Sequence, residues 1–352
     1  MKQKRLLVIA LSGIGDALMF TPALKRIREE RPDLAVDVLL MYKAAADIYE
    51  RSGLADRVLF FDFLNANPLS ALRYVLSLRG KYDFSISVYP SNRKEYAVIS
   101  FLIGADRRGG IKYKRVYKKE LGFLNNVLVD EDDRKHNTEH NLMIAAKLLG
   151  FEAGTPPELV FNLTGDDRSF AEEYIRTLPQ GKRVIGMHPG CSLLKNHIKR
   201  RWEPEKFASL AKKLITDDNA LVLIFGGPEE EELKEYIRKE CNSEFCFSVK
   251  TKNLAQSAAI IGKCDVFVTN DSSQMHVAAA MQRKTIAIIG PTNTSYIYPW
   301  RTEHTMVSLG LECSPCFFYS PSPLSCSRSD VQFKCIKEID TQMVYTAVKK
   351  YL

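Results

Sequence analysis

A carboxylate, Asp16, stands at the helix start in the stretch "LLVIALSGIGDALMF". The apolar run Leu6–Leu11 predicts a buried strand, and the spacing from Ala17 onward predicts an amphipathic helix. A glycine-rich loop between strand and helix usually binds phosphate through backbone N–H groups. Here, however, Leu18 occupies the third glycine position of GxGxxG, and the charge of Asp16 would repel a pyrophosphate. Asp16 is therefore either a helix cap or a group that acts on something other than phosphate.

The best candidate for a phosphate site is "VTNDSSQMHVAAAM". A buried strand there runs into a helix predicted to begin near Gln274, so backbone N–H groups and the helix dipole favour a diphosphate. His276 lies one turn into this helix and could add a hydrogen bond or a positive charge. The alternative is that Asp271 or Ser272 only caps the helix and that His276 is a core residue.

Two other loops follow predicted strands of the second half. In "GMHPGCSLLKNHIKRRW", Ser192 and a basic run can hold phosphate oxygens, unless the run is only a solvated surface loop. The basic run comprises Lys195, Lys199, Arg200 and Arg201. In "FGGPEEEEL", two glycines let a ligand approach the backbone and Glu229 could accept from ribose hydroxyls, although an acidic helix start needs no ligand.

These loops must be positioned by alternating strands and helices, which predict parallel sheets covered on both faces. The first strands are expected at Leu6–Leu11, Val36–Met41, Val58–Phe61 and Phe84–Tyr89. The alternation of strand and helix patterns is interrupted at "GFEAGTPPELVFNLTGDD" and then resumes. We predict an α/β protein with an N-terminal Rossmann-like domain (1–160), a C-terminal Rossmann-like domain (161–338) and a last helix (339–352) that packs back on the N-terminal domain. The two sheets are expected to face each other across a central cleft.

The composition limits the class of protein. The chain has 352 residues and a formal net charge of +8, which favours anionic partners. It shows no zinc-finger, homeodomain or RNA-recognition motif, so nucleic acid is not a predicted partner. The N-terminal apolar run is too short for a signal peptide, and no run could span a bilayer. We expect a cytoplasmic protein, peripheral on the inner face of the cytoplasmic membrane.

A basic segment and a group of cysteines remain. The segment "DRRGGIKYKRVYKK" interleaves cations with Tyr113 and Tyr117, and is either a binding surface for an anionic acceptor or membrane, or a solvated loop. Its candidate ligands are Arg107, Arg108, Lys112, Lys114 and Arg115.

Four cysteines lie close together in the sequence near the C-terminus. They could hold a structural metal or be reduced packing thiols, and we assign them no catalytic role. They are Cys313, Cys316, Cys326 and Cys335.

Several stretches together resemble glycosyltransferase family nine, the bacterial lipopolysaccharide heptosyltransferases. They are "SGIGDALMFTPAL", "MHPGCS" with the basic run before Trp202, "GGPEE", "TNDSSQMHVAAAM" and "IGPT", and they cover nearly the whole chain in the family's order. The resemblance implies a GT-B fold and an inverting mechanism with no metal and no cofactor. It also implies ADP-heptose as donor and a lipid-linked oligosaccharide, such as the lipopolysaccharide inner core, as acceptor.

The resemblance also implies roles for individual residues. Asp16 is the general base, and Gly13 and Gly15, grouped with the donor-binding residues, line its loop. The remaining donor ligands are Ser192, Lys199 and Arg200 for the diphosphate, Glu229 for the ribose, and Asp271, Ser272, Ser273 and His276 for the phosphates and sugar. The family more often has glycine at the position of Ser273 and lysine at that of Arg200.

Two alternative functions stay open at this point. The same fold could use another nucleotide sugar for a different surface glycan, because only a few side chains contact the sugar hydroxyls and determine which sugar is bound. A non-catalytic scaffold that keeps only the fold is the second alternative. It would be expected to have lost the base or the clamp, whereas Asp16, Asp271 and His276 are all present.

Overall fold

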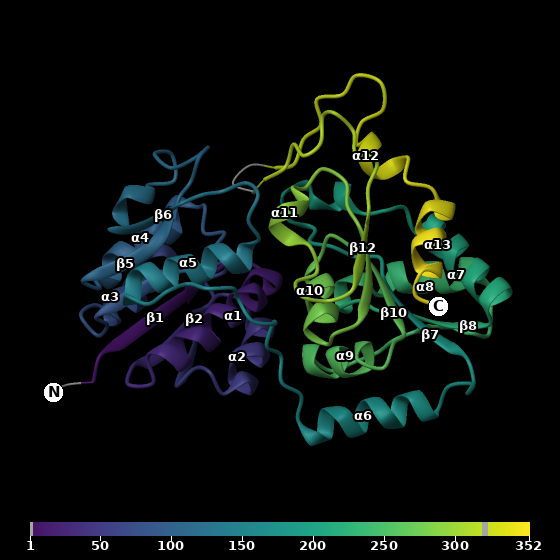
Figure 1. The fold of residues 1–352 in the computed structure, drawn as a ribbon, viewed down its shortest axis with the longest axis horizontal. Helices are drawn as coiled ribbons and strands as arrows, with labels where there is room; N and C mark the ends of the chain where they lie inside the picture. Colours follow the sequence, from purple (N-terminus) through teal and green to yellow (C-terminus); the bar gives the residue numbers. More distant parts are fainter. Residues whose placement is uncertain (1–2, 319–322) are drawn as a thin grey trace. The chain divides into compact units, whose positions relative to one another are not determined.

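The computed structural model describes residues 3–318 and 323–352, without the side chains of Leu194 and Lys195. The chain divides into two compact units, Met1–Asn162 and Leu163–Leu352, each built on its own sheet (Figure 1). Both sheets have six strands, and every strand pair is parallel. The predicted α/β class with two parallel sheets is therefore confirmed.

The N-terminal sheet has the strand order β3-β2-β1-β4-β5-β6. Its strands are β1 (Arg5–Ala10), β2 (Ala35–Leu40), β3 (Arg57–Phe60), β4 (Phe84–Ser87), β5 (Arg107–Lys112) and β6 (Val127–Asp130). The helices are α1 (Ile14–Glu30), α2 (Ala46–Ser52), α3 (Pro68–Ser77), α4 (Lys94–Ile103) and α5 (Asn137–Leu149), with short 3₁₀ turns η1 (Lys43–Ala45) and η2 (Gly122–Leu124). The connections leave β1 and β4 in opposite directions, so a topological switch point lies between these two strands.

Alternation along β1 explains how this sheet is covered. Leu7 and Ile9 pack with Val75 of α3 and Ile103 of α4, whereas their neighbours along β1 point to the other face and are also fully buried. On that other face α1 packs against α5, and α5 contacts β4, β5 and β6. Both faces are thus covered, as a parallel sheet requires.

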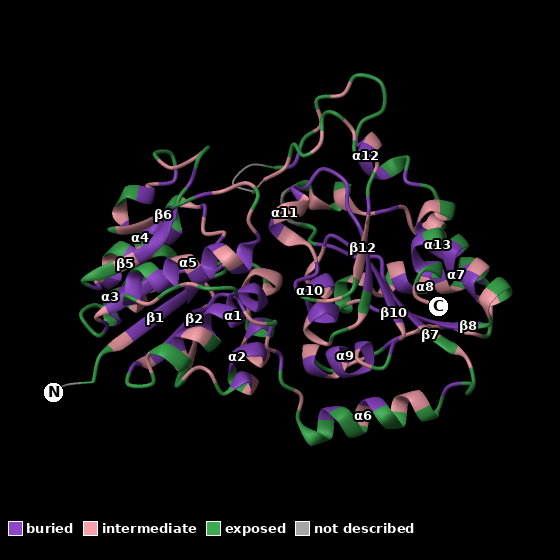
Figure 2. Ribbon diagram, viewed as in Figure 1, coloured by how far each residue is buried: buried purple, intermediate pink, exposed green. Residues whose placement is uncertain are grey.

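The C-terminal sheet has the order β12-β11-β10-β7-β8-β9. Its strands are β7 (Arg183–His188), β8 (Ala220–Ile224), β9 (Cys246–Ser248), β10 (Val266–Asn270), β11 (Lys284–Ile288) and β12 (His304–Val307). The helices are α6 (Gly165–Arg176), α7 (Pro204–Asp218), α8 (Glu231–Cys241), α9 (Leu254–Ile261), α10 (Ser273–Ala280), α11 (Thr294–Ile297), α12 (Lys334–Lys337) and α13 (Thr341–Lys349), with 3₁₀ turns η3 (Leu194–Arg200) and η4 (Pro228–Glu230). Strands β8 and β10 are buried along their whole length (Figure 2). Here the switch point lies between β7 and β10.

The last helix is part of the second unit, where α13 contacts α7, β11 and β12. Its apolar residues Val344, Ala347 and Val348 recur at helical spacing and are buried in the core of that unit. Because this single stripe is already buried against the second unit, α13 belongs there. The expectation that residues 339–352 pack back on the N-terminal domain stays a prediction.

None of the helices formed by the described residues is both long and apolar enough to cross a bilayer.

Candidate functional site

Asp16 lies at the start of α1, directly beyond the carboxyl end of β1. It is the third residue of the helix, and its Oδ2 accepts a hydrogen bond of 3.1 Å from the backbone N–H of Gly13, the N-cap residue. Gly15 is the second residue of the same turn. A carboxylate at this position accepts from a backbone N–H that would otherwise have no partner at the helix end, so Asp16 does cap α1. A carboxylate can accept about four hydrogen bonds, and one N–H does not exhaust it.

The charge of the Asp16 carboxylate acts on three tyrosines of the same unit. Burial raises the pKa of Tyr42 and of Tyr49, and the negative charge of Asp16 raises both further. Burial also raises the pKa of Tyr96 to about 12, although the Arg93 guanidinium opposes this. These phenols are therefore protonated hydrogen-bond donors at neutral pH. Sequence reasoning missed them, although Tyr42 follows β2 and Arg93 follows β4 at the edge of the sheet that carries Asp16.

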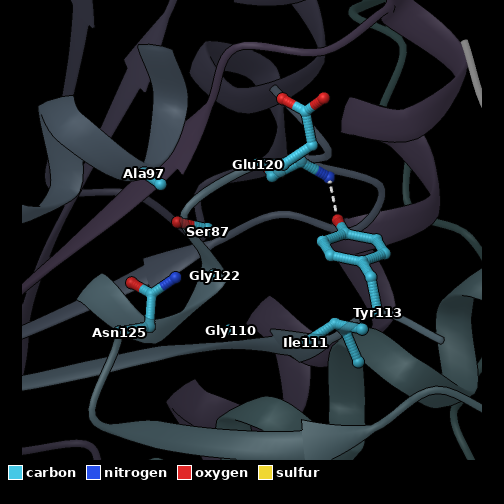
Figure 3. Close-up of a pocket in the computed structure, with 9 residues that line it drawn as sticks. Ser87, Ala97, Gly110, Ile111, Tyr113, Glu120, Gly122 and Asn125 are labelled. Atoms are coloured by element: carbon cyan, nitrogen blue, oxygen red, sulfur yellow. Dashed lines mark hydrogen bonds between the residues drawn. The ribbon is translucent and has the colours of Figure 1, made fainter. Parts of the chain in front are cut away.

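A small cavity of the N-terminal unit lies between β4, β5 and η2 (Figure 3). Its volume is about 10 Å³, and Ser87, Tyr113 and Asn125 are among its lining residues. This volume holds about one water molecule. The cavity is therefore too small to be a sugar site.

In the second unit, the turn between β10 and α10 lies beside the end of β7. Ser272 is the N-cap residue of α10, and its Oγ is 3.0 Å from Nδ1 of His188, the last residue of β7. The same hydroxyl is 3.1 Å from Oγ1 of Thr269 in β10. These contacts fix the N-terminus of α10 at the switch point, where open α/β sheets bind ligands.

Asp271 joins three loops of this edge. Its Oδ2 accepts hydrogen bonds of 2.6 Å from Nη1 of Arg200 and of 2.6 Å from Oγ1 of Thr292. The Arg200 and Asp271 side chains are only 12% and 10% exposed, and the guanidinium carbon lies 5.3 Å from the ring centre of Phe317. Arg200 is therefore held in place after β7 by loops that follow β10 and β11.

Glu230 completes the cluster of polar side chains around the N-terminus of α10. Its carboxylate is 3.2 Å from Nε2 of His188 and 3.5 Å from the Arg201 guanidinium, and it accepts from the N–H of Gly227 at 3.0 Å. Burial raises the pKa of this carboxyl, but these hydrogen bonds and charges together hold it below its ordinary value. A Cβ at Gly190 would lie 1.6 Å from Glu230 Oε1, so a larger residue there would displace this carboxylate from its present position.

The predicted donor residues are only partly brought together. Arg200, Asp271 and Ser272 lie in one network, and Ser273 begins α10 beside it. The others lie at the surface: Ser192, Lys199 and Glu229 are exposed. The side chain of Lys195 lies outside those described. The sequence analysis missed His188, Thr292 and Glu230, yet the spacing of Gly227 and Glu230 matches a helix N-cap and its third residue and could have distinguished Glu230 from Glu229.

His276 is buried in the first turns of α10. Burial lowers its pKa to about 4, and the nearby Asp271 only partly opposes this. The imidazole is therefore neutral at pH 7, so of the two predicted contributions it can supply a hydrogen bond but not a positive charge. Its Nδ1 has no hydrogen-bond partner within residues 3–318 and 323–352.

Replacing His276 with glutamine is expected to remove part of the pH dependence of stability. An unfolded histidine titrates near pH 6.5, above the folded pKa of about 4, so the unfolded chain binds this proton first. Wild-type stability should therefore fall as the pH drops from about 6.5 to about 4. Between pH 7 and pH 4.5, urea unfolding should show the wild type losing about 2 kcal/mol more than the variant. Equal losses would show that His276 does not titrate in this way.

The five candidate acceptor ligands of the basic segment each have a partner inside their own unit. Arg115 pairs with Asp133 at 2.9 Å and Lys114 with the same carboxylate at 3.4 Å. Lys112 lies 3.6 Å from Asp130, and the Arg107 and Arg108 guanidiniums donate to backbone carbonyls. These contacts order the segment, and its role in acceptor binding stays a prediction.

The cysteine cluster is built from free thiols. Cys313 and Cys316 are exposed, whereas burial raises the pKa of Cys335 to about 11. The Cys326 sulfur accepts from the backbone N–H of Phe333 at 3.2 Å. Within residues 3–318 and 323–352, no group of three or more His, Cys, Asp or Glu is arranged to hold a metal ion.

Two Rossmann-like units with polar loops at the carboxyl ends of their strands define the architecture of GT-B glycosyltransferases. Comparison with solved structures supports this class: the E. coli ADP-heptose lipopolysaccharide heptosyltransferase II matches with a TM-score of 0.73 at 21% identity, over 99% of this chain and 98% of that one. An E. coli heptosyltransferase, WaaC, solved with ADP-2-deoxy-2-fluoro heptose, matches with a TM-score of 0.67 at 17% identity, over 99% and 100% of the two chains.

Sequence comparison identifies the family. The profile of glycosyltransferase family 9 (heptosyltransferase) matches residues 72–324. Lipooligosaccharide heptosyltransferase 2 of Campylobacter jejuni is 29% identical over 355 residues, covering 96% of this chain and 95% of that protein. The chain therefore belongs to glycosyltransferase family 9, the heptosyltransferase family, and the predicted resemblance is confirmed.

Proposed function

We propose that this glycosyltransferase moves heptose from ADP-heptose onto a lipid-linked, anionic oligosaccharide such as the lipopolysaccharide inner core. The second unit binds the donor, and Asp16 of the first unit is the general base. The reaction is a single displacement that inverts the anomeric carbon. Binding and proton transfer are thus divided between the two units.

The observation that carries the donor site is the cluster at the N-terminus of α10. It contains buried donor atoms that have no hydrogen-bond partner among the described residues, namely Arg200 Nε, Arg201 Nε and His276 Nδ1. Unpaired buried donors cost free energy unless a ligand satisfies them. A diphosphate would accept from the guanidiniums and from the backbone N–H groups of the helix start.

In the proposed reaction, the Asp16 carboxylate and the positive groups around the diphosphate have different roles. The acceptor hydroxyl oxygen forms a bond to the anomeric carbon while the bond from that carbon to the phosphate oxygen breaks. The hydroxyl proton passes to Asp16, and ADP leaves with the electron pair. Arg200 and the positive end of α10 stabilise the charge that develops on the leaving diphosphate. A carboxylate beside the diphosphate would oppose this, which is why Asp16 fits the proton and not the phosphate.

The comparisons support the choice of donor and acceptor. WaaC, which shares the fold, was solved with a fluorinated ADP-heptose, and the C. jejuni relative is named for lipooligosaccharide. The basic segment that contains Lys114 and Arg115 supplies cations suited to a phosphorylated acceptor. We propose this segment as the acceptor-binding surface, in the inner-membrane setting where such acceptors are found.

A donor screen on the full chain tests the proposal. Calorimetric titration with ADP-heptose, and with UDP-, GDP- and CMP-sugars, should give the tightest binding for ADP-heptose, and transfer should continue in EDTA because arginines and a helix end hold the diphosphate. Tighter binding of another nucleotide sugar would favour the alternative donor. A strict requirement for divalent metal would contradict the mechanism.

Replacing Lys114 and Arg115 together with glutamine is expected to raise the acceptor KM by up to about thirtyfold, since each lost cation near an anionic surface weakens binding by about 1 kcal/mol at most. Glutamine is used because a glutamate beside Asp133 would add repulsion within the unit. The donor KM serves as the internal control and should stay within about twofold, an effect of under about 0.5 kcal/mol. An unchanged acceptor KM would remove this segment from the binding surface.

A further inference from the structure

We propose that the outer surface of α3, α4 and η2 in the N-terminal unit docks on an anionic lipid bilayer. This α3–α4 face consists of Leu69, Leu72, Leu76, Val98, Phe101 and Phe123 with the cations between and around them. The proposal goes beyond the transfer reaction, because binding to a bilayer needs neither donor nor acceptor.

Helix α3 is apolar on two opposite sides. Val75 is buried in the core beneath the helix, as expected for the inner side of a surface helix. The solvent side, however, carries Leu69, Leu72 and Leu76 at spacings of three and four residues, with exposed fractions of 55%, 41% and 43%. A surface helix normally presents polar residues on this side. An apolar stripe one helix long is therefore left without a covering element inside the unit.

The stripe continues onto the neighbouring elements. Helix α3 contacts α4, and α4 contacts η2. On these elements Val98, Phe101 and Phe123 are 36%, 48% and 56% exposed. The Arg108 guanidinium lies 5.6 Å from the Phe101 ring centre and donates to the Leu124 carbonyl of η2, so it links the two elements.

This concentration of exposed apolar side chains is confined to one part of the chain. Among the described residues, twelve large apolar side chains are exposed, and eight of them lie between Phe60 and Phe123. Contiguous exposed apolar surface of this kind marks an interaction site, whereas scattered single residues do not. The question is which partner would cover it.

Charge identifies the partner as an anionic lipid surface. Residues 68–124 contain twelve Lys or Arg and four Asp or Glu, and three of these cations, Lys112, Lys114 and Arg115, pair with Asp130 and Asp133 just beyond this range. Arg73 is exposed within the leucine stripe, and Lys118 and Lys119 near η2 have no ion-pair partner in the described part of the chain. Apolar side chains that enter the interface together with cations that contact anionic headgroups are the requirements of peripheral membrane binding. A second copy of this face would instead bring like charges together.

Vesicle co-sedimentation of the full chain tests the assignment, with no donor or acceptor present. The wild type should bind vesicles of phosphatidylcholine with about 30% phosphatidylglycerol at least about tenfold more strongly than pure phosphatidylcholine, and added salt should weaken binding. The L69Q/L72Q/L76Q variant should bind the anionic vesicles at least about tenfold less than wild type, because the apolar area that enters the interface is lost. The matched control Y236Q/V331Q removes exposed apolar residues of the second unit and should bind like the wild type.

The outcomes separate this proposal from the proposed function. Donor titration of the triple variant should match wild type and show that the chain is folded. Unchanged vesicle binding by the triple variant, or equal binding to neutral vesicles, would overturn the membrane assignment and leave the transferase proposal untouched. A change of oligomeric state without loss of vesicle binding would assign the face to a second copy instead.

Discussion

Asparagine in place of Asp16 is expected to lower kcat by at least about a hundredfold, the contribution of a general base. The amide oxygen of asparagine can still accept from the N–H of Gly13, and asparagine and aspartate are nearly equivalent at helix starts, so the thermal midpoint should stay near that of the wild type. Donor affinity should be equal or higher, because a negative charge has been removed. Steady-state kinetics together with thermal melts measure both effects.

The variant separates the two roles of Asp16 because the cap contact is visible in the structure. A kcat within a few-fold of wild type would mean that the carboxylate only caps α1. A loss of activity that follows a loss of folded protein would mean the same. Asp16→Ala is the matched control: it removes both the base and the cap, so it should show the kinetic loss together with a destabilisation of about 1 kcal/mol.

Replacing Arg200 with methionine is expected to have the second-largest effect. Its guanidinium is our proposed diphosphate clamp, so the Kd for ADP-heptose should rise by at least about tenfold, as when a charge-assisted hydrogen bond is lost. Stability should also fall by about 2 kcal/mol, because Asp271 is left as a buried carboxylate whose remaining hydrogen-bond partner among the described residues is Thr292. Titration calorimetry and urea unfolding measure the two losses separately.

The double variant R200M/D271N tests whether Arg200 contacts the diphosphate or only pairs with Asp271. Removing both charges should recover most of the lost stability, since no unpaired buried charge remains. Donor affinity should stay low if Arg200 itself contacts the diphosphate. Recovery of donor affinity along with stability would show instead that Arg200 acts only by neutralising Asp271.

The fold was largely predictable because its signals are local. The apolar runs at the starts of both halves correspond to β1 and β7, and the loops that follow them carry the candidate residues. The loop sequences also predicted that Arg200, Asp271 and Ser272 belong to one site. The structure brings these residues to one edge of the C-terminal sheet, because the carboxyl ends of parallel strands meet there, and their role in donor binding stays a prediction.

The failures concern non-local contacts. Tyr42 and Tyr96 come within reach of the Asp16 charge because β1, β2 and β4 are neighbours, and no spacing in the sequence contains that information. The neutral state of His276 depends on how deeply α10 is buried. Among four consecutive glutamates, helix geometry turns Glu230 toward His188, which the sequence analysis did not indicate, and the predicted ribose contact of Glu229 stays a prediction.

The anomeric configuration of the product is the most direct test of the account. Wild-type protein would be incubated with ADP-heptose of defined anomeric configuration and a lipid-linked inner-core acceptor, and the new linkage would be examined by NMR spectroscopy. A single displacement with Asp16 as base predicts one added heptose whose configuration is opposite to that of the donor. Retention of configuration, or no transfer of heptose from ADP-heptose at all, would contradict the central claim.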